Sequence, residues 1–375
     1  MCSESSQKSK GKIIAVDFFC GAGGLTRGFR NVGIDVRLGI DKDLAFGKTY
    51  AENNKENIPA TFWGMSVEDV KSEDVWACLA PKNEDKIVVA GCAPCQPFSA
   101  QNKKNVLKGH KDDRKDLLSQ MLRVVKKFKR LPDYFFIENV PGFKKSQCSS
   151  YRRLKSFLKK NHYSVGEDVI DAAIYGVPQR RKRFILIAKK EVSEEQVKKL
   201  MFPPITHGPG KIDFVTVEQA FNKPSPLPPI KSGGNSPKFF NHHVPKLSPE
   251  NSKRIKGTPK NGGSHRDIPQ QDRVPCRLRH PTKHSDTYGR MWWKKVSPTL
   301  TCKCVSISNG RFVHPTQNRA ISIREAARLQ TFPDNYKFYG TGITSEARQV
   351  GNAVPVKLAE VFGKYFVELD QKQKE

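Results

Sequence analysis

Apolar stretches that alternate with helix-like stretches constrain the fold of this chain more than any other feature. The first, residues 13–19, is a nearly unbroken apolar run, as in a parallel strand buried on both faces. The pattern continues with strands expected at 36–40, 87–90, 134–137 and 184–188, and helices at 25–32, 44–53, 117–128, 151–158, 322–330 and 356–367. Strands that alternate with helices predict a doubly wound α/β sheet.

The texture of the sequence changes near residue 200. Residues 222–237 are rich in Pro, Gly and Ser, and residues 241–295 carry 13 Lys and Arg against 4 Asp and Glu, without a clear period. We therefore expect four parts, which are a disordered tail at 1–11, an α/β domain at 12–200, a basic irregular domain at 201–318 and a C-terminal segment at 319–375.

The chain carries a formal net charge of +29, from 66 Lys and Arg against 37 Asp and Glu. Such an excess favours binding to polyanions, because bound phosphates release counterions, although a merely soluble basic protein is the plainer interpretation. No apolar run approaches the ~20 residues that span a bilayer, and residues 1–11 lack the apolar core of a signal peptide. The nine cysteines are scattered and odd in number, so we expect a reducing cytoplasm.

The first motif with chemical content is the glycine-rich turn DFFCGAGGL at 17–25. It follows a strand and opens a helix, where the bare backbone can approach a ligand and the helix N-terminus favours an anionic group. Thr26 occupies the third glycine position of the dinucleotide-binding fingerprint, so that fingerprint is absent. Asp41 follows the next strand, where nucleotide-binding sheets place their ribose acid. The motif indicates a nucleoside site, against the simpler hypothesis of a tight turn and a surface Asp.

Cys95 lies in the segment GCAPCQPFS, at the carboxyl end of the strand at 87–90, where open α/β sheets place their chemistry. Its spacing from Cys92 also fits a dithiol redox centre or half of a zinc site. Further zinc ligands could be imagined at Cys302 and Cys304, or at Cys276, His280 and His284, but the spacing matches no common structural zinc pattern. A buried structural cysteine is the plain alternative.

Three further segments carry polar residues in suggestive places. An apolar strand delivers Glu138 at its carboxyl end, where the group either shares a proton with a ring nitrogen or faces solvent. Gln179, Arg181 and Arg183 share one face of a strand-like stretch, which directs them into one cleft or along a solvated basic edge. Residues 349–355, QVGNAVP, are interpreted as a turn before the last helix.

Taken together and in this order, these segments resemble the DNA cytosine carbon-5 methyltransferase family, in its bacterial restriction-modification form. The resemblance runs from Asp17 to about Phe362 and leaves out the insert at roughly 204–295, where that family varies. It implies a Rossmann-like methyltransferase sheet at 12–200, a target-recognition domain at 201–318 and a segment at 319–375 that returns to the catalytic domain. It also implies S-adenosyl-L-methionine as cofactor, double-stranded DNA as partner, no metal, no membrane and a monomer.

The resemblance assigns roles to single residues. Cys95 resembles the family's nucleophile, Glu138 its cytosine-binding acid, and Arg181 and Arg183 the arginines that flank the catalytic pocket. The residues that resemble the family's cofactor site are Phe19, which is expected to stack on adenine, Gly21, Gly23, Gly24, the ribose acid Asp41 and Asn352. One departure stands at Gly64-Met65-Ser66, where the family often has an Asp for the adenine amino group. Either Ser66 substitutes for that Asp or the contact is lost.

The family's chemistry implies that the Cys95 thiolate adds to carbon-6 of a flipped-out cytosine, so that carbon-5 becomes nucleophilic and receives the methyl group. Three alternatives stay open, namely a tRNA cytosine methyltransferase of the same fold, a non-catalytic DNA-binding descendant and a redox protein. The Cys-Phe-Thr signature usual in the tRNA enzymes is absent, since residues 300–302 are Leu-Thr-Cys. The compact length favours a microbial enzyme in the cytoplasm, and a nuclear location stays open. The sequence also leaves open whether the enzyme has a cognate restriction endonuclease as genetic partner or is solitary.

Overall fold

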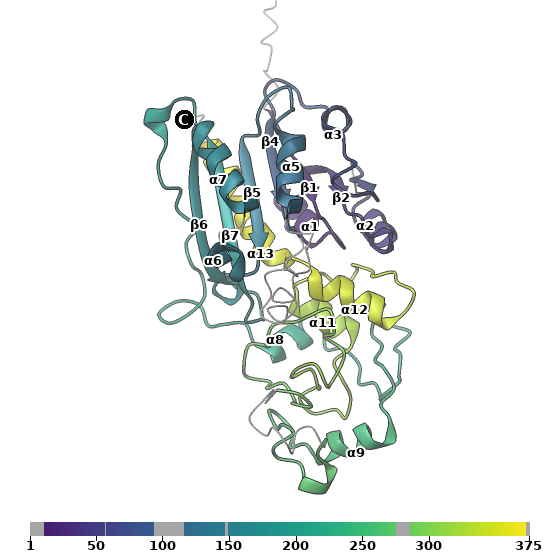
Figure 1. Cartoon of the computed structure of the whole chain (residues 1–375). Coiled ribbons are helices and arrows are strands. Elements are labelled where there is room, and N and C mark those ends of the chain that lie inside the picture. Colours follow the sequence, from purple (N-terminus) through teal and green to yellow (C-terminus); the bar gives the residue numbers. More distant parts are fainter. Residues whose placement is uncertain (1–10, 57, 94–115, 147–148, 275–285, 373–375) are drawn as a thin grey trace, which may run out of the picture.

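The computed structural model describes residues 11–56, 58–93, 116–146, 149–274 and 286–372. In Figure 1 these residues form a layered α/β body and, below it, a smaller lobe with little regular structure. Of the segment expected to be a disordered tail, residues 1–10 lie outside the described part.

A seven-stranded sheet forms the centre of the α/β body. Its strands are β1 (Ile13–Phe18), β2 (Asp35–Ile40), β3 (Thr61–Trp63), β4 (Lys86–Gly91), β5 (Tyr134–Asn139), β6 (Tyr163–Asp171) and β7 (Lys182–Lys190). They lie in the order β3-β2-β1-β4-β5-β7-β6, parallel from β3 to β5, with β7 antiparallel to both β5 and β6. The predicted doubly wound α/β class is confirmed, as a mixed sheet with one reversed strand.

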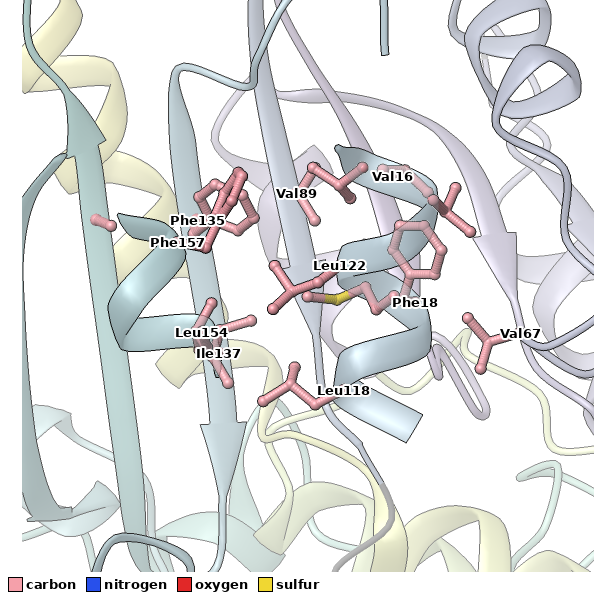
Figure 2. Packing of buried hydrophobic residues seen from close by; sticks show 14 of the residues in the cluster. Val16, Phe18, Val67, Val89, Leu118, Leu122, Phe135, Ile137, Leu154 and Phe157 are labelled. Atoms are coloured by element: carbon pink, nitrogen blue, oxygen red, sulfur yellow. The ribbon is translucent and has the colours of Figure 1, made fainter. Parts of the chain in front are cut away.

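Helices cover both faces of the sheet, because successive strand residues point to opposite sides and both sides of these strands are apolar. The first face carries α1 (Gly24–Asn31) and α13 (Val356–Gln371), and the second carries α3 (Ser72–Leu79), α5 (Leu117–Val125) and α7 (Ser149–Lys160). Figure 2 shows the second layer, where Leu122 of α5 and Leu154 of α7 pack beside Val89 and Ile137 of the sheet.

Helix α13 returns from the far end of the chain to lie against α1. A Cβ on Gly28 of α1 would lie 2.5 Å from both the Ala359 Cβ and the Val356 carbonyl oxygen, so glycine permits this close approach. A Cβ on Gly24 would likewise lie 2.3 Å from the Val354 carbonyl oxygen. The residues just before α13 therefore touch the end of the glycine-rich turn.

The remaining helices are short. They are η1 (Leu44–Phe46), α2 (Gly47–Asn53), α6 (Gly142–Ser146), η4 (Ala172–Tyr175), η5 (Glu194–Gln196), α8 (Val217–Asn222), α9 (Pro249–Gly257), η6 (Gln270–Asp272), α11 (Ile323–Leu329) and α12 (Ile343–Asn352). Helices α8, α11 and α12 share an apolar cluster that includes Phe221, Leu329 and Val350, and this cluster lies between the sheet and the loops of the smaller lobe.

The structure differs from the sequence expectations in several places, and α3, α8 and α9 are helices that were not expected. The helix expected at 44–53 is divided into η1 and α2, with Asp43 capping the first part through a hydrogen bond from the Ala45 amide. The strands β3 and β6 were not anticipated, since β3 has three residues and β6 is an acidic edge strand. The segment 349–355 is not simply a turn, because its first four residues end α12, whose Ala347 and Val350 are buried.

Within the described residues, no helix combines the length and the apolar character that crossing a membrane requires.

Candidate active site

The carboxyl ends of five strands lie in one row across the sheet. Phe18 of β1 is paired with Ile40 of β2 on one side and with Gly91 of β4 on the other. The row continues through Ile137 of β5 and Trp63 of β3. Neighbouring strands lie ~4.8 Å apart, so the five ends span roughly 20 Å, and all of them release the chain at the same edge of the sheet.

The residues that follow the row are those the sequence singled out, namely Gly64, Asp41, Phe19, Cys92 and Glu138. The antiparallel strand β7 begins at the same edge, since its residue Phe184 pairs with Asn139 at the end of β5. The fold therefore brings the glycine-rich turn, the acid after β2, the start of the Cys95 loop and the Glu138 segment to one edge. Residues 94–115, and with them Cys95, lie outside the described part of the chain.

The glycine-rich turn adopts a backbone that few side chains tolerate. Phe19 has φ 61°, Gly21 φ 52° and Gly23 φ 83°, all in the left-handed region. A non-glycine residue in this region costs ~1 kcal/mol or more and is often found where a site demands it. The space above Gly21 is open as far as the described residues show, because a Cβ there would meet only the Phe46 ring among them, at 4.0 Å. The turn thus leaves room for a ligand against its backbone.

Asp41 holds the turn from the neighbouring strand end. Its Oδ2 accepts a hydrogen bond from the Gly21 amide at 3.0 Å, and its Oδ1 accepts one from the Asp43 amide at 2.9 Å. Burial raises the pKa of the Asp41 carboxyl, although these two hydrogen bonds oppose the shift. Asp43 in turn forms a salt bridge with Arg348 of α12. The acid predicted for the ribose position therefore lies directly beside the glycine-rich turn.

Asp17, at the end of β1, is a buried acid whose role the sequence did not reveal. Its Oδ2 accepts a hydrogen bond from the Thr26 hydroxyl at 2.7 Å, and the Tyr50 hydroxyl lies 3.0 Å from that of Thr26. Its Oδ1 is buried and has no hydrogen-bond partner among the described residues. Burial raises the pKa of Asp17 to about 7, and the neighbouring Asp41 charge adds to the shift, while the hydrogen bond from Thr26 opposes it. The sequence did contain one signal for this residue, which is an acidic side chain inside an otherwise apolar strand.

Glu138 and Arg183 form an ion pair at this edge. The Arg183 Nε lies 2.8 Å from the Glu138 Oε1, and the side chains are 14% and 7% exposed. The next residue, Asn139, donates from its Nδ2 to the Ala93 carbonyl oxygen at 3.4 Å and accepts at its Oδ1 from the Val140 amide at 2.9 Å. Asn139 thereby ties the Glu138 segment to the last described residue before Cys95.

Arg181 is placed differently from Arg183. Its guanidinium donates hydrogen bonds to the carbonyl oxygens of Leu300 (3.1 Å), Gly351 (3.3 Å) and Ala353 (3.1 Å), and it lies 3.4 Å from the Gln179 Oε1. The side chain is buried. The structure thus brings Arg183 to Glu138, whereas Arg181 connects β7 to the residues on both sides of Asn352.

Asn352 is the exposed last residue of α12. The following Ala353 lies close to Gly24, since a Cβ on Gly24 would be 3.3 Å from the Ala353 Cβ. Gln330 fixes this junction by donating to the Val350 carbonyl oxygen at 2.7 Å and to that of Ala353 at 3.2 Å. The C-terminal motif therefore reaches the end of the glycine-rich turn through Ala353, the neighbour of Asn352.

The departure after β3 has a local explanation. The Ser66 hydroxyl donates to the Glu68 Oε2 at 3.1 Å, and its carbonyl oxygen accepts from the Asp69 amide at 3.0 Å. In this arrangement the Ser66 hydroxyl already has an acceptor, the Glu68 carboxylate.

The metal hypothesis finds no support in the described residues, which contain no cluster of three or more His, Cys, Asp or Glu suited to an ion. Cys302 is exposed and Cys304 is buried. The other imagined ligands, Cys95, Cys276, His280 and His284, lie outside the described residues.

Comparison with known proteins decides the family. The family model described as C-5 cytosine-specific DNA methylase matches residues 13–368. The chain belongs to this family. The methylase is thus a DNA (cytosine-5)-methyltransferase, and the resemblance drawn from the motifs is confirmed. This activity also accounts for the glycine-rich turn and the positive net charge, which the alternative of a redox protein leaves unexplained.

Its relatives include the type II methylase M.HgiDII of Herpetosiphon aurantiacus, which is 36% identical over 93% of both chains. The type II methyltransferase M1.BsuMI of Bacillus subtilis is 30% identical over 92% of this chain and 78% of its own length. Among solved structures, a prophage-encoded DNA modification methyltransferase of E. coli superposes with a TM-score of 0.64 at 23% identity, over 96% of this chain and 100% of that one. The Dnmt2 methyltransferase of S. pombe gives a TM-score of 0.57 at 15% identity, over 96% and 99%. These two structures share the fold.

Proposed function

We propose that this methylase transfers a methyl group from S-adenosyl-L-methionine to carbon-5 of a flipped-out cytosine in a specific duplex DNA sequence, through a covalent adduct of Cys95. The observation that carries the proposal is the row of strand ends, which places the glycine-rich turn, Asp41, the start of the Cys95 loop and Glu138 at one edge. Family membership supports the reaction, and the row of strand ends supports a common site for these segments.

The residues at the turn fit S-adenosyl-L-methionine, which the family uses. The cofactor is a nucleoside with a cationic amino-acid tail, and the site offers an aromatic ring at Phe19, open space above Gly21 and the acid Asp41. The buried Oδ1 of Asp17, for which the described ranges of the chain provide no hydrogen-bond partner, is suited to a cation. We assign Phe19 to the adenine, Asp41 to the ribose, and Gly21, Gly23, Gly24 and Asn352 to the remaining cofactor contacts. When bound, the cofactor supplies an electrophilic methyl group.

The other half of the edge fits the target base. The Cys95 thiolate adds to carbon-6, which makes carbon-5 nucleophilic, and loss of the carbon-5 proton after methylation releases the thiolate. Glu138 binds ring N3 and the exocyclic amino group, and so offsets the charge that develops on the ring. Arg183 holds the Glu138 carboxylate in place through their 2.8 Å contact. The target base reaches this edge by leaving the duplex stack, which costs roughly a few kcal/mol.

Arg181 belongs to the same site as a positioning residue. It holds the carbonyl oxygens of Gly351 and Ala353, the neighbours of Asn352, and that of Leu300 in the smaller lobe. We propose that it aligns the cofactor side of the site with the lobe that reads DNA.

Sequence recognition is assigned to residues 201–318, the target-recognition domain of this proposal, while residues 12–200 carry the chemistry and 319–375 return to them. This lobe is irregular and basic, as base-edge and phosphate contacts require. The type II names of the relatives favour a cytoplasmic enzyme of a restriction-modification system, with a cognate restriction endonuclease as genetic partner. We further propose that the enzyme is a monomer.

The proposal is tested by expressing the full chain in cells without cytosine methylation and sequencing their DNA after bisulfite treatment. We expect protected cytosines at one short sequence with the wild type and none with Cys95→Ala. In parallel, methyl transfer to tRNA and to duplex DNA is assayed with the purified enzyme. Methylated tRNA with unmodified DNA would contradict the proposal.

A further inference from the structure

A basic groove runs between α5 and α7. Figure 1 shows these two helices on the same face of the sheet. It consists of two adjoining hollows of about 400 Å³ and about 430 Å³, which both include Lys126 and Arg153 in their walls. Lys127 lines the first hollow and Lys160 lines the second.

The groove has a strong excess of positive charge. Helix α7 carries five basic residues and no acidic one, and the segment after α5, residues 126–130, reads KKFKR. Like charges held this close repel one another unless anions lie among them. A surface of this composition is a footprint for a polyanion, because each neutralised phosphate releases counterions.

Several cations of this region already have partners. Arg153 pairs with Asp116 at 3.1 Å, Arg130 lies 3.6 Å from Asp133, and Arg123 donates to backbone carbonyl oxygens between Val67 and Val70. Four exposed lysines, Lys126, Lys127, Lys159 and Lys160, have no salt bridge to any residue that the structure describes. Of these, Lys126, Lys127 and Lys160 line the hollows and are available to a ligand there.

The free lysines lie near the amino-terminal ends of the parallel strands, opposite the carboxyl ends that form the active site. Helix α5 ends at Val125, shortly before β5 starts at Tyr134, and α7 ends at Lys160, shortly before β6 starts at Tyr163. Tyr163 pairs with Lys190, the last residue of the reversed strand β7, which begins at the active-site edge. A duplex seated at the active site therefore leaves these lysines to another stretch of nucleic acid.

We propose that the α5/α7 groove binds the phosphate backbone of a second duplex DNA segment, distinct from the segment at the active site. Duplex DNA is the occupant because it is the substrate of this family and is present as long chains whose other segments stay close by. The contact is independent of sequence, since lysines meet phosphates rather than base edges. A methylase held by two segments can pass from one to the other during its search for target sites.

A bridging experiment with the full-length enzyme tests the inference. Enzyme is loaded on an immobilised short duplex at low salt, unbound enzyme is washed away, and a fluorescent duplex of unrelated sequence is added. The wild type should retain the second duplex. The variant Lys126→Gln/Lys160→Gln should retain it roughly tenfold less at 0.1 M salt, with a salt slope smaller by about 1.8, since each phosphate contact contributes about 0.9.

The matched control is Lys364→Gln/Lys372→Gln, which removes the same charge from α13 and its end on the other face of the sheet. It should behave as the wild type, and all three proteins should load equally on the first duplex and methylate plasmid DNA at equal rates. The inference is overturned if the wild type retains no second duplex, if both variants lose it equally, or if the groove retains labelled RNA in place of duplex DNA. Because methylation is scored separately, failure of the groove leaves the proposed function untouched.

Discussion

Asp17→Asn should stabilise the cofactor-free enzyme at pH 8, although it removes a charge from the centre of the site. Asp17 is buried, one of its oxygens has no partner in the part of the chain that the structure describes, and its pKa is raised from 3.8 to about 7. Between these two values the folded chain keeps a proton that the unfolded chain has lost, so the free energy of unfolding falls by about 1.4 kcal/mol for each pH unit of rise. Over about three pH units the free energy of unfolding falls by roughly 4 kcal/mol. This destabilisation is fully present above pH 7 and absent below pH 3.8.

Asparagine is neutral at every pH and its amide oxygen still accepts the hydrogen bond that the Thr26 hydroxyl gives to Asp17 at 2.7 Å. Denaturant unfolding from pH 4.5 to 8.5 should therefore show Asp17→Asn gaining on the wild type as pH rises, by up to about 4 kcal/mol at pH 8. The exposed Asp69→Asn serves as control and should run parallel to the wild type. The same Asp17 variant should bind S-adenosyl-L-methionine more weakly. Parallel curves for Asp17→Asn and wild type, or a loss of stability at pH 8, would refute the reasoning.

Three further substitutions separate the roles within the site. Asp41→Ala should raise the KM for S-adenosyl-L-methionine and leave the methylated sequence unchanged, and an unaltered KM would move the ribose contact elsewhere. Arg183→Ala leaves the Glu138 carboxylate buried without its 2.8 Å partner, at a cost of roughly 3 kcal/mol, and should lower kcat far more than Arg183→Lys does in steady-state assays. Arg181→Met should lower the unfolding free energy by roughly 3 kcal/mol in denaturant titrations, because three carbonyl oxygens lose the Arg181 donor and that of Ala353 alone keeps the one from Gln330. A variant as stable as the wild type would contradict the positioning role.

The sheet was predictable because its central strands are apolar on both faces. Residues 13–19 and 134–137 form nearly unbroken apolar runs, and the structure buries both strands completely. The edge strands gave no such signal, since β3 has three residues and β6 contains Glu167, Asp168 and Asp171. Helix α12 was missed because its stability comes from burial of residues such as Ala347 and Val350 against α11, a contact that a single sequence does not display.

The site was predictable where a residue follows a strand directly. Asp41 and Glu138 end apolar strands, so the register of the sheet alone brings them to one edge. The separate positions of Arg181 and Arg183 were not predictable from alternation. Residues two apart on a strand share a face, so alternation predicts that both arginines point the same way. The partners of Arg181, Gly351 and Ala353, lie some 170 residues away in the chain, and the contact with them depends on tertiary packing that a single sequence does not display.

The central claim, a covalent bond between Cys95 and the target cytosine, is tested most directly with duplex DNA in which 5-fluorocytosine replaces every cytosine, so that the recognised sequence need not be known. The fluorine blocks loss of a proton from carbon-5, so the adduct should persist on denaturing gels in the presence of S-adenosyl-L-methionine. Mass spectrometry of its peptides should place the DNA on Cys95, with no adduct from Cys95→Ala and a normal adduct from Cys92→Ala. An adduct that survives Cys95→Ala, or one that maps to Cys92, would contradict the account.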